Sequence, residues 1–267
     1  MSRFFVETDA ADLQNGKIMI TGEDVRHIAN VLRASPGDVL VLCDGAGTDY
    51  DAVIERISKE SIETSIRDSR PNNTEPPVRV TLFQGVPKSD KMDFIIQKCV
   101  ELGVKQVVPV MTARSVVRFK NTSDAAAKTA RWARIALEAA KQCDRGVIPV
   151  VREPVRLDEA LKLAGGIGLK LFPYEEERGG SLRNVLKDYG KSMVCGNALN
   201  SVAVLIGPEG GFDRNEAERA VEAGFHSVTL GPRILRTETA GLATAAIVMY
   251  ELGDMGGNAV RTCDHDR

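Results

Sequence analysis

The stretch VAVLIGPEGGFDRNEAERAVEAG, residues 202–224, decides the fold class. It starts with a continuous apolar run at 202–206, which is typical of a buried strand, and then turns through GPEGG. Asp213 with Glu216 three residues later forms the pattern of a capping box and predicts a helix that ends at Gly224. A strand, a glycine-rich loop and a helix in this order are a building unit of a parallel α/β sheet.

The same order recurs in SVTLGPRILRTETAGLATAAIVMYELG, residues 227–253. A strand at 228–230 runs into the loop GPRILRTETA, and an apolar helix follows that is too short to cross a bilayer. Open α/β sheets place ligands at the carboxyl ends of their strands. We therefore expect the two loops to form one ligand site.

Upstream, apolar strand patterns alternate with helical patterns. Strands are predicted in VRVTLFQG (78–85), QVVPVM (106–111), VIPVV (147–151) and GLKLF (168–172). Helices are predicted at 91–103, 125–142 and 157–163. This alternation predicts a parallel sheet covered by helices on both faces.

The first 70 residues follow another pattern. DVLVLCD (38–44) and SIETSIR (61–67) indicate strands separated by the turn-rich DGAGTD, and one helix is expected near 22–32. SRPNNTEPP (69–77) breaks the apolar periodicity. We predict a β-barrel domain at 1–70, a linker at 71–77, an α/β domain at 78–255 and a flexible tail at 256–267.

The glycine-rich loops also invite a nucleotide-binding interpretation. Neither loop has the G-x-G-x-x-G or G-x-x-x-x-G-K-[ST] spacing, and Pro208 and Pro232 remove backbone donors that a phosphate would need. A nicotinamide-dependent oxidoreductase is therefore disfavoured. The alternative that the glycines only permit tight turns stays open.

Composition and charge narrow the function classes. The start of the chain lacks the apolar stretch of a secretory signal, so we expect a cytoplasmic protein without a membrane anchor. The three histidines have no metal-ligand spacing to another His or Cys, so no metal site is expected. The net charge is -2, yet residues 114–145 hold eight Lys and Arg against three acids. Such a local excess suits phosphate backbones, although a solvated helix face would explain it equally.

Four motifs in order resemble one known family. IGPEGGF and LGPRILRTETA, with PKSDKMDFIIQKCVELGV (87–104) and EAAKQCDRGVIPVV (138–151), are similar to the SPOUT superfamily of RNA methyltransferases. Within it they resemble the RsmE-type enzymes, which methylate N3 of a uridine in 16S (small-subunit) ribosomal RNA. The resemblance implies S-adenosylmethionine as cofactor, a deep trefoil knot in the C-terminal domain, a PUA-like N-terminal barrel and a homodimer.

In that family the cofactor lies between three loops. Carried onto this chain, the resemblance implies that they hold it through Phe172, Pro173, Tyr174, Ile206, Gly207, Glu209, Gly210, Leu230, Gly231, Ile234 and Leu235. Backbone groups and apolar walls would contact the adenosine, which fits the glycines and leucines found there.

Methylation of a uridine N3 needs an unpaired base, loss of the N3 proton and stabilisation of the resulting negative charge. The candidates are Arg236 as charge stabiliser or RNA ligand, Glu238 as base or orienting group, and Glu209 as a second carboxylate. Glu238 could instead be an ordinary first-turn helix charge, and Arg236 a structural ion-pair partner. Transfer by positioning alone, without a dedicated base, also stays open.

Contacts to RNA are expected from basic residues in two segments, with Lys88 and Lys91 as weaker candidates for a phosphate. The candidate RNA-binding residues are Arg26, Arg33, Arg114, Arg118, Arg131 and Arg145. Two other functions remain: a knotted methyltransferase with another target, such as a tRNA ribose hydroxyl, and a non-catalytic RNA-binding assembly factor.

Overall fold

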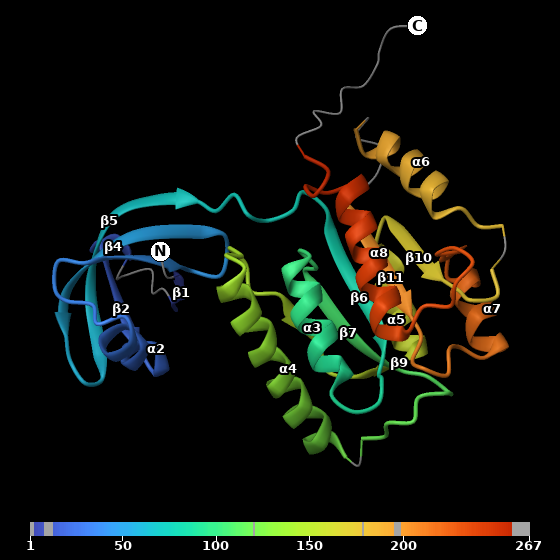
Figure 1. Cartoon of the computed structure of the whole chain (residues 1–267), viewed down its shortest axis with the longest axis horizontal. Coiled ribbons are helices and arrows are strands. Elements are labelled where there is room, and N and C mark those ends of the chain that lie inside the picture. Colours follow the sequence, from blue (N-terminus) through green and yellow to red (C-terminus); the bar gives the residue numbers. More distant parts are fainter. Residues whose placement is uncertain (1–2, 8–12, 120, 178, 195–198, 258–267) are drawn as a thin grey trace, which may run out of the picture. The chain divides into compact units, whose positions relative to one another are not determined.

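The computed structural model describes residues 3–7, 13–119, 121–177, 179–194 and 199–257, and the predicted tail falls outside them from residue 258 onward. The chain divides into two compact units (Figure 1). The first contains Met1–Glu75 and Ala140–Ile148, and the second contains Pro76–Ala139 and Pro149–Arg267. A segment far along the chain thus returns to the N-terminal unit.

The N-terminal unit is a mixed five-stranded sheet in the order β1-β3-β4-β5-β2. β1 pairs in parallel with β3, and the other neighbours are antiparallel. The elements are β1 (Arg3–Phe5), β2 (Lys17–Thr21), α2 (Glu23–Arg26), a π-helical turn (His27–Val31), β3 (Val39–Cys43), β4 (Thr48–Ile57) and β5 (Ser61–Pro71). The sheet is a half-barrel, because the strand order defined by its hydrogen bonds starts at β1 and ends at β2 without closing.

The core of this unit follows the alternation seen in the sequence. Ile18 and Ile20 of β2 are buried, while Lys17, Met19 and Thr21 face outward. Buried side chains from β3, β4 and the short helical segment complete one apolar cluster. The alternation arises because neighbouring residues of a strand point to opposite faces, of which one is covered.

Glu75 joins the returning segment to the rest of the N-terminal unit. Its carboxylate accepts hydrogen bonds from the Arg145 guanidinium at 2.8 Å and from the backbone N–H groups of Gly146 and Val147. Arg145 is only 3% exposed. Burial alone would raise the pKa of Glu75, but the Arg145 charge and these hydrogen bonds outweigh it and hold the pKa below its usual value.

The second unit is a seven-stranded parallel sheet with the order β12-β10-β11-β6-β7-β8, in which β9 also pairs with β7. Its strands are β6 (Arg79–Gly85), β7 (Gln106–Met111), β8 (Val150–Val151), β9 (Val155–Arg156), β10 (Leu169–Pro173), β11 (Ser201–Ile206) and β12 (His226–Val228). Its helices are α3 (Lys91–Glu101), α4 (Thr122–Gln142), α5 (Leu157–Leu163), α6 (Leu182–Val194), α7 (Arg214–Glu222) and α8 (Thr237–Glu251). The parallel α/β sheet predicted from the sequence is confirmed.

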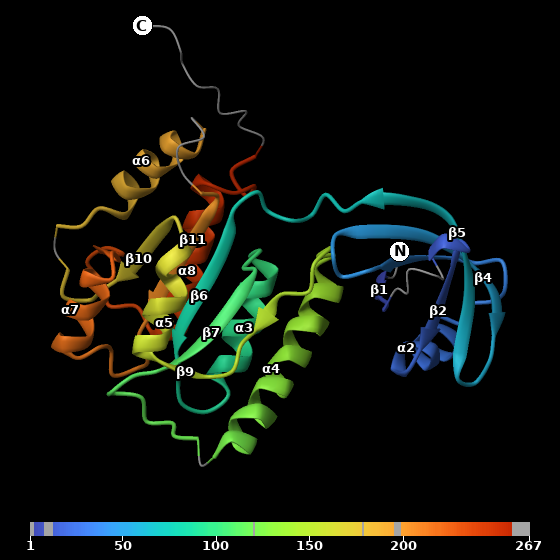
Figure 2. The same ribbon diagram turned by 180° about the vertical axis from the view of Figure 1, so that it is seen from behind.

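Helices cover both faces of this sheet (Figures 1 and 2). Phe83, Leu205 and Phe172 of three central strands pack in one cluster with residues of α5 and α7. On the other face α8 packs against β6, β11, α3 and α6. Every residue of β11 is buried, as expected for a strand covered on both faces.

Three features of the second unit can be compared with the sequence analysis: one prediction is confirmed, one helix was missed, and one prediction stays untested. The capping box of Asp213 and Glu216 is present at the start of α7, as predicted. Helix α6 was not predicted, although Leu182, Val185 and Leu186 recur there at helical spacing. The trefoil knot stays a prediction, because strand order and pairing do not define how the chain is threaded.

Candidate functional site

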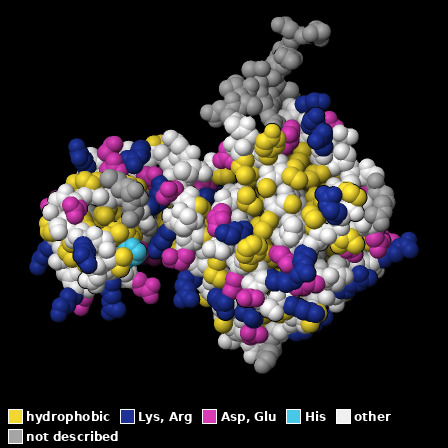
Figure 3. All heavy atoms as spheres, in the orientation of Figure 1, with side chains coloured by type: hydrophobic (Ala, Val, Ile, Leu, Met, Phe, Trp, Pro, Cys, Tyr) yellow, Lys and Arg dark blue, Asp and Glu magenta, His cyan; other side chains and the backbone are white. Residues whose placement is uncertain are grey.

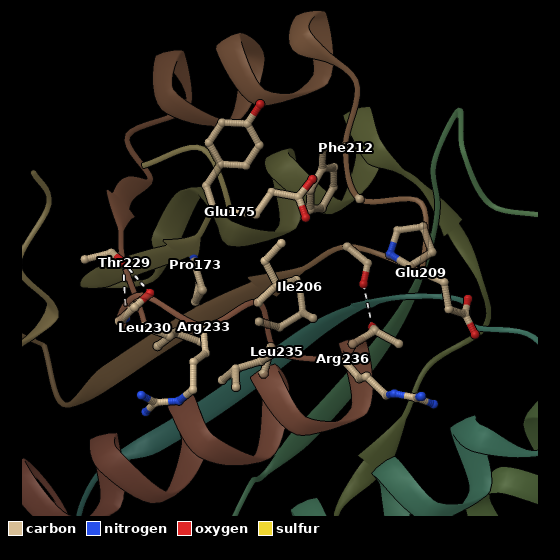
Figure 4. A pocket seen from close by; sticks show the side chains of 18 of the residues that line it. Pro173, Glu175, Ile206, Glu209, Phe212, Thr229, Leu230, Arg233, Leu235 and Arg236 are labelled. Carbon is tan, nitrogen blue, oxygen red and sulfur yellow. Dashed lines mark hydrogen bonds between the residues drawn. The ribbon is translucent and has the colours of Figure 1, made fainter. Parts of the chain in front are cut away.

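Three loops meet at the carboxyl ends of the neighbouring strands β12, β10 and β11 (Figure 4). They line a cavity of about 330 Å³ together with the first residues of α8. This volume lies within the range of small-molecule sites, roughly 300–1,000 Å³. The ligand site expected between the two glycine–proline loops therefore exists as a cavity, and a third loop, after β10, completes its wall.

Most residues predicted to hold a cofactor line this cavity. They are Pro173, Tyr174, Ile206, Gly207, Glu209, Leu230, Gly231, Ile234 and Leu235. Phe172 and Gly210 are not among the lining residues. Phe172 is fully buried beneath the cavity, where its ring stacks on Tyr174 at 5.1 Å and meets Phe212 edge to face at 5.2 Å. Its position supports the wall of the cavity from below.

Gly207 and Gly231 have different reasons to be glycine. A Cβ on Gly207 would lie 3.0 Å from the Phe212 ring and 3.1 Å from the Gly211 Cα, so a side chain there would require its neighbours to shift by a few tenths of an ångström. Gly231 has φ +101°, which side chains rarely adopt, and a Cβ there would meet nothing within 4 Å. The first glycine permits close packing, and the second permits the turn.

A buried hydrogen-bond chain ties two cavity loops to the central strand. The Gln84 amide donates to the Thr237 hydroxyl at 2.8 Å, and that hydroxyl donates to the Gly207 carbonyl at 2.5 Å (Figure 4). Gln84 is completely buried at the end of β6. The sequence analysis did not predict this pair. The available signal was Gln84, the only amide side chain in the mostly apolar stretch TLFQGV (81–86).

Three charged side chains meet at one edge of the cavity. The Lys91 ammonium at the start of α3 lies 3.0 Å from the Glu209 carboxylate and 3.4 Å from that of Glu238. Glu209 also accepts from the Lys88 backbone N–H at 3.2 Å. The structure thus brings together the two predicted carboxylates and Lys91, which the sequence offered only as a weaker phosphate candidate. Lys91 and Glu209 line the cavity, whereas Glu238 is not among its lining residues.

The electrostatics of this edge follow from the contacts. The hydrogen bond to Glu209 raises the pKa of Lys91 above its usual value. Burial alone would raise the pKa of Glu209, but the Lys91 ammonium and backbone N–H groups outweigh it, so that pKa is lowered. Glu209 is therefore a stable anion, and a carboxylate with a lowered pKa is a weak general base near neutral pH.

Three further charged residues line the cavity: Glu175, Arg233 and Arg236. Arg236 immediately precedes α8, and in Figure 4 its guanidinium extends on the same side as Glu209, away from Leu230. The Glu175 carboxylate, on the loop after β10, points toward Ile206 and Phe212. Glu175 was not predicted; its position directly after the strand in LFPYEEE was the only available signal.

The predicted RNA-binding arginines occupy different environments. Arg114, Arg118 and Arg131 belong to the second unit and are exposed, as are Arg26 and Arg33 in the first. Arg114 also donates to the Gly210 carbonyl at 3.0 Å, which places it beside the GPEGG loop. The buried, ion-paired Arg145 serves the packing of the N-terminal unit, as described above.

Neither a metal centre nor a membrane span is found in the described part of the chain. Among those residues, no group of three or more His, Cys, Asp or Glu is arranged to hold a metal ion. Within the same ranges, each helix is too short or too polar to span a membrane.

Comparisons with known proteins agree with this architecture. The sequence model described as an RNA methyltransferase domain matches residues 74–249, and that of an RNA methyltransferase PUA domain matches residues 20–67. The ribosomal RNA small subunit methyltransferase E of Bacillus subtilis is 33% identical over 94% of this chain and 97% of that protein. The protein of the same name from Aquifex aeolicus is 34% identical over 76% of this chain and 82% of its own length.

A solved structure extends the likeness to three dimensions. The ribosomal RNA small subunit methyltransferase E of Neisseria gonorrhoeae, bound to S-adenosylmethionine, has a TM-score of 0.80 and 34% identity. The match covers 96% of this chain and 99% of that one. The chain therefore belongs to the RNA methyltransferase family whose curated members are named ribosomal RNA small subunit methyltransferase E.

Proposed function

We propose that this protein transfers a methyl group from S-adenosylmethionine to N3 of a uridine in small-subunit ribosomal RNA. One observation carries the proposal: three loops at the carboxyl ends of β12, β10 and β11 enclose a cavity, in a chain of the RNA methyltransferase family. The relative from Neisseria gonorrhoeae was solved with S-adenosylmethionine bound.

The residues of the cavity suit this cofactor. Ile206, Leu230 and Leu235 offer an apolar wall for the adenine, and the loops around Gly207 and Gly231 expose backbone groups. The Glu175 carboxylate points into the same space, where it would complement a positively charged ligand. When bound there, S-adenosylmethionine supplies an electrophilic methyl group on a sulfonium.

The protein's own residues would then bind the target base and handle its proton. The uridine must leave any base pair before its N3 can enter the site. Glu238, in the first turn of α8, would orient N3 or accept its proton, while Arg236 would stabilise the negative charge that spreads to O2 and O4. Both carboxylates pair with Lys91, but Glu209 also accepts from the Lys88 backbone N–H, so we favour the less tightly held Glu238.

The RNA would be held by exposed cations close to the cavity loops and on the N-terminal unit. Arg114 adjoins the GPEGG loop, and Arg118 and Arg131 follow it in the basic stretch, while Arg26 and Arg33 lie in the half-barrel. Each neutralised phosphate releases counterions, so binding should weaken steeply with salt. Replacing Arg114 and Arg118 by Ala should reduce the slope of log affinity against log salt by about one for each phosphate that is no longer neutralised.

We propose that the protein acts in the cytoplasm. We also propose that, besides RNA, it binds a second copy of its own chain. Helix α8 is apolar on all sides, yet Ile247 and Tyr250 are 41% and 65% exposed. Figure 3 shows hydrophobic side chains gathered over α8. Such a helix is normally buried all around. Light scattering should give twice the chain mass, and Tyr250→Glu should yield monomers; a monomeric wild type would refute the dimer.

The decisive experiment is mapping of the methylated nucleotide. Small-subunit ribosomal RNA and assembled 30S particles, each treated with the protein and isotopically labelled S-adenosylmethionine, would be digested and analysed by mass spectrometry. A labelled N3-methyluridine is expected. A labelled ribose in tRNA would favour another target, and binding of RNA without any transfer would favour an assembly factor.

A further inference from the structure

The ammonium of Lys91 lies between the two carboxylates of the site. Lys91 is the first residue of α3, which follows β6 through the short loop at 86–90. Its partners come from elsewhere in the chain: Glu209 from the loop after β11 and Glu238 from the first turn of α8. One cation therefore connects three elements at the edge of the cavity.

Glu238 depends on this cation more than Glu209 does. Its Oε2 is buried and, within the described residues, has no hydrogen-bond partner; the Lys91 Nζ at 3.4 Å is its ion-pair partner. Glu209, by contrast, is also held by the Lys88 backbone N–H. A buried carboxylate oxygen is costly without a counter-charge, so removal of the Lys91 ammonium should disturb Glu238 most.

We propose that Lys91 is a positioning residue for methyl transfer: anchored by Glu209, its ammonium fixes the position of the Glu238 carboxylate at the edge of the cavity. This inference rests on the proposed function, because it assigns a purpose to the geometry of Glu238. Glu209 acts as the fixed anchor of Lys91, which explains why its carboxylate points away from Ile206 and Leu230 in Figure 4. Lys91 acts through Glu238 and needs no contact with the base.

The charge balance of this edge makes the proposal testable by pH. Besides Glu209 and Glu238, the loop at 86–90, the start of α3 and the loop before α8 carry the charged residues Lys88, Asp90, Asp93, Arg233 and Arg236. An opposite charge within about 4–6 Å favours the ionised carboxylate. Without the Lys91 ammonium, protonation of Glu209 should occur at higher pH, because Lys91 helps to lower its pKa.

The test compares Lys91→Met with Lys91→Arg, and Lys98→Met serves as the matched control. Lys98 lies on the same helix and pairs only with Glu101 among the ion pairs of the described residues. Lys91→Met should lower kcat at least tenfold, with the KM for RNA and the S-adenosylmethionine affinity within about threefold of wild type. Lys91→Arg should restore most of kcat, and Lys98→Met should match wild type.

A double-mutant comparison separates this role from direct RNA binding. If Lys91 acts through Glu238, adding Lys91→Met to Glu238→Gln should cost little more than Glu238→Gln alone. Additive effects that appear as a raised KM for RNA would overturn the proposal and make Lys91 a phosphate ligand. An unchanged kcat in Lys91→Met would overturn it as well.

A measurement that requires no methyl transfer tests the role of Lys91 separately from the proposed function. The carboxyl carbons of glutamates labelled with ¹³C can be titrated by NMR in wild type and in Lys91→Met. The carboxyl titration of Glu209 should move to higher pH in the variant, and absence of this shift refutes the inference. If the wild-type protein transfers no methyl group, the proposed function fails, while the titration still decides whether Lys91 holds these carboxylates.

Discussion

Gly85 should be essential for the shape of the cavity although it does not line it. It is the last residue of β6, and its backbone lies against the GPEGG loop. A Cβ added there would lie 2.5 Å from both the Cδ and the backbone nitrogen of Pro208, and 2.8 Å from the Gly207 carbonyl carbon. The atoms in the way belong mainly to backbone, so no side-chain rotation relieves the overlap.

The cost of Gly85→Ala can be worked out from these distances. Ordinary contact begins at 3.4 Å, so the loop must retreat by about 0.9 Å. Overpacking of this kind costs about 1–3 kcal/mol. If this strain falls on the GPEGG loop, it weakens the binding of S-adenosylmethionine. Because about 1.4 kcal/mol corresponds to a factor of ten, the affinity should drop by about fivefold to about a hundredfold.

Isothermal titration calorimetry with S-adenosylmethionine measures this drop in affinity directly, and single-turnover methyl transfer shows whether chemistry suffers too. Gly165→Ala is the matched control, because a Cβ there meets nothing within 4 Å and its φ is not positive. The control should bind as wild type does. If Gly85→Ala retains wild-type affinity and rate, the close approach of β6 to the GPEGG loop does not affect function, and the prediction is wrong.

The remaining predictions concern the two buried polar links. Thr237→Val deprives the Gln84 amide and the Gly207 carbonyl of a partner, so it should destabilise the protein by about 1–3 kcal/mol in denaturant unfolding and weaken cofactor binding. Glu75→Gln removes the carboxylate that pairs with the buried Arg145 guanidinium, which should cost about 3 kcal/mol at pH 7. The Glu75 pKa is lowered from its usual 4.5, so the stabilisation is complete above that value and is lost as pH falls through the lowered pKa. Wild type and Glu75→Gln should therefore converge in stability in acid.

Conservative variants check both links. Thr237→Ser keeps the hydroxyl and should retain most of the stability and affinity that Thr237→Val loses. Glu60→Gln changes an exposed glutamate of the same unit and should alter stability by no more than about 0.5 kcal/mol. Equal effects of Thr237→Ser and Thr237→Val, or a stability difference for Glu75→Gln that persists unchanged in acid, would contradict the assigned interactions.

Much of the architecture could be predicted because its signals are local. The all-buried strand β11, the capping box at Asp213 and the apolar face of α3 with Ile95 and Ile96 all follow from neighbouring residues. Helix α6 was missed although Leu182, Val185 and Leu186 recur at helical spacing, so a local signal was present. In the half-barrel, the strands predicted at 38–44 and 61–67 correspond to β3 and β5, whereas β1, β2 and β4 were not predicted. Whether the sheet closes depends on pairing between distant strands.

The sequence by itself determined the strand–loop–helix units, and with them that the glycine–proline loops lie at the carboxyl ends of strands. Only the tertiary structure decided which strands are neighbours: β10 lies between β11 and β12, so a third loop completes the cavity. It also decided that Lys91 meets Glu209 and Glu238, and that Arg145 serves Glu75. The physical reason is the distance along the chain over which each feature is determined. Strand and helix patterns arise within a few residues. These ion pairs join residues 70 to about 150 positions apart, and sheet order and packing decide whether such residues meet.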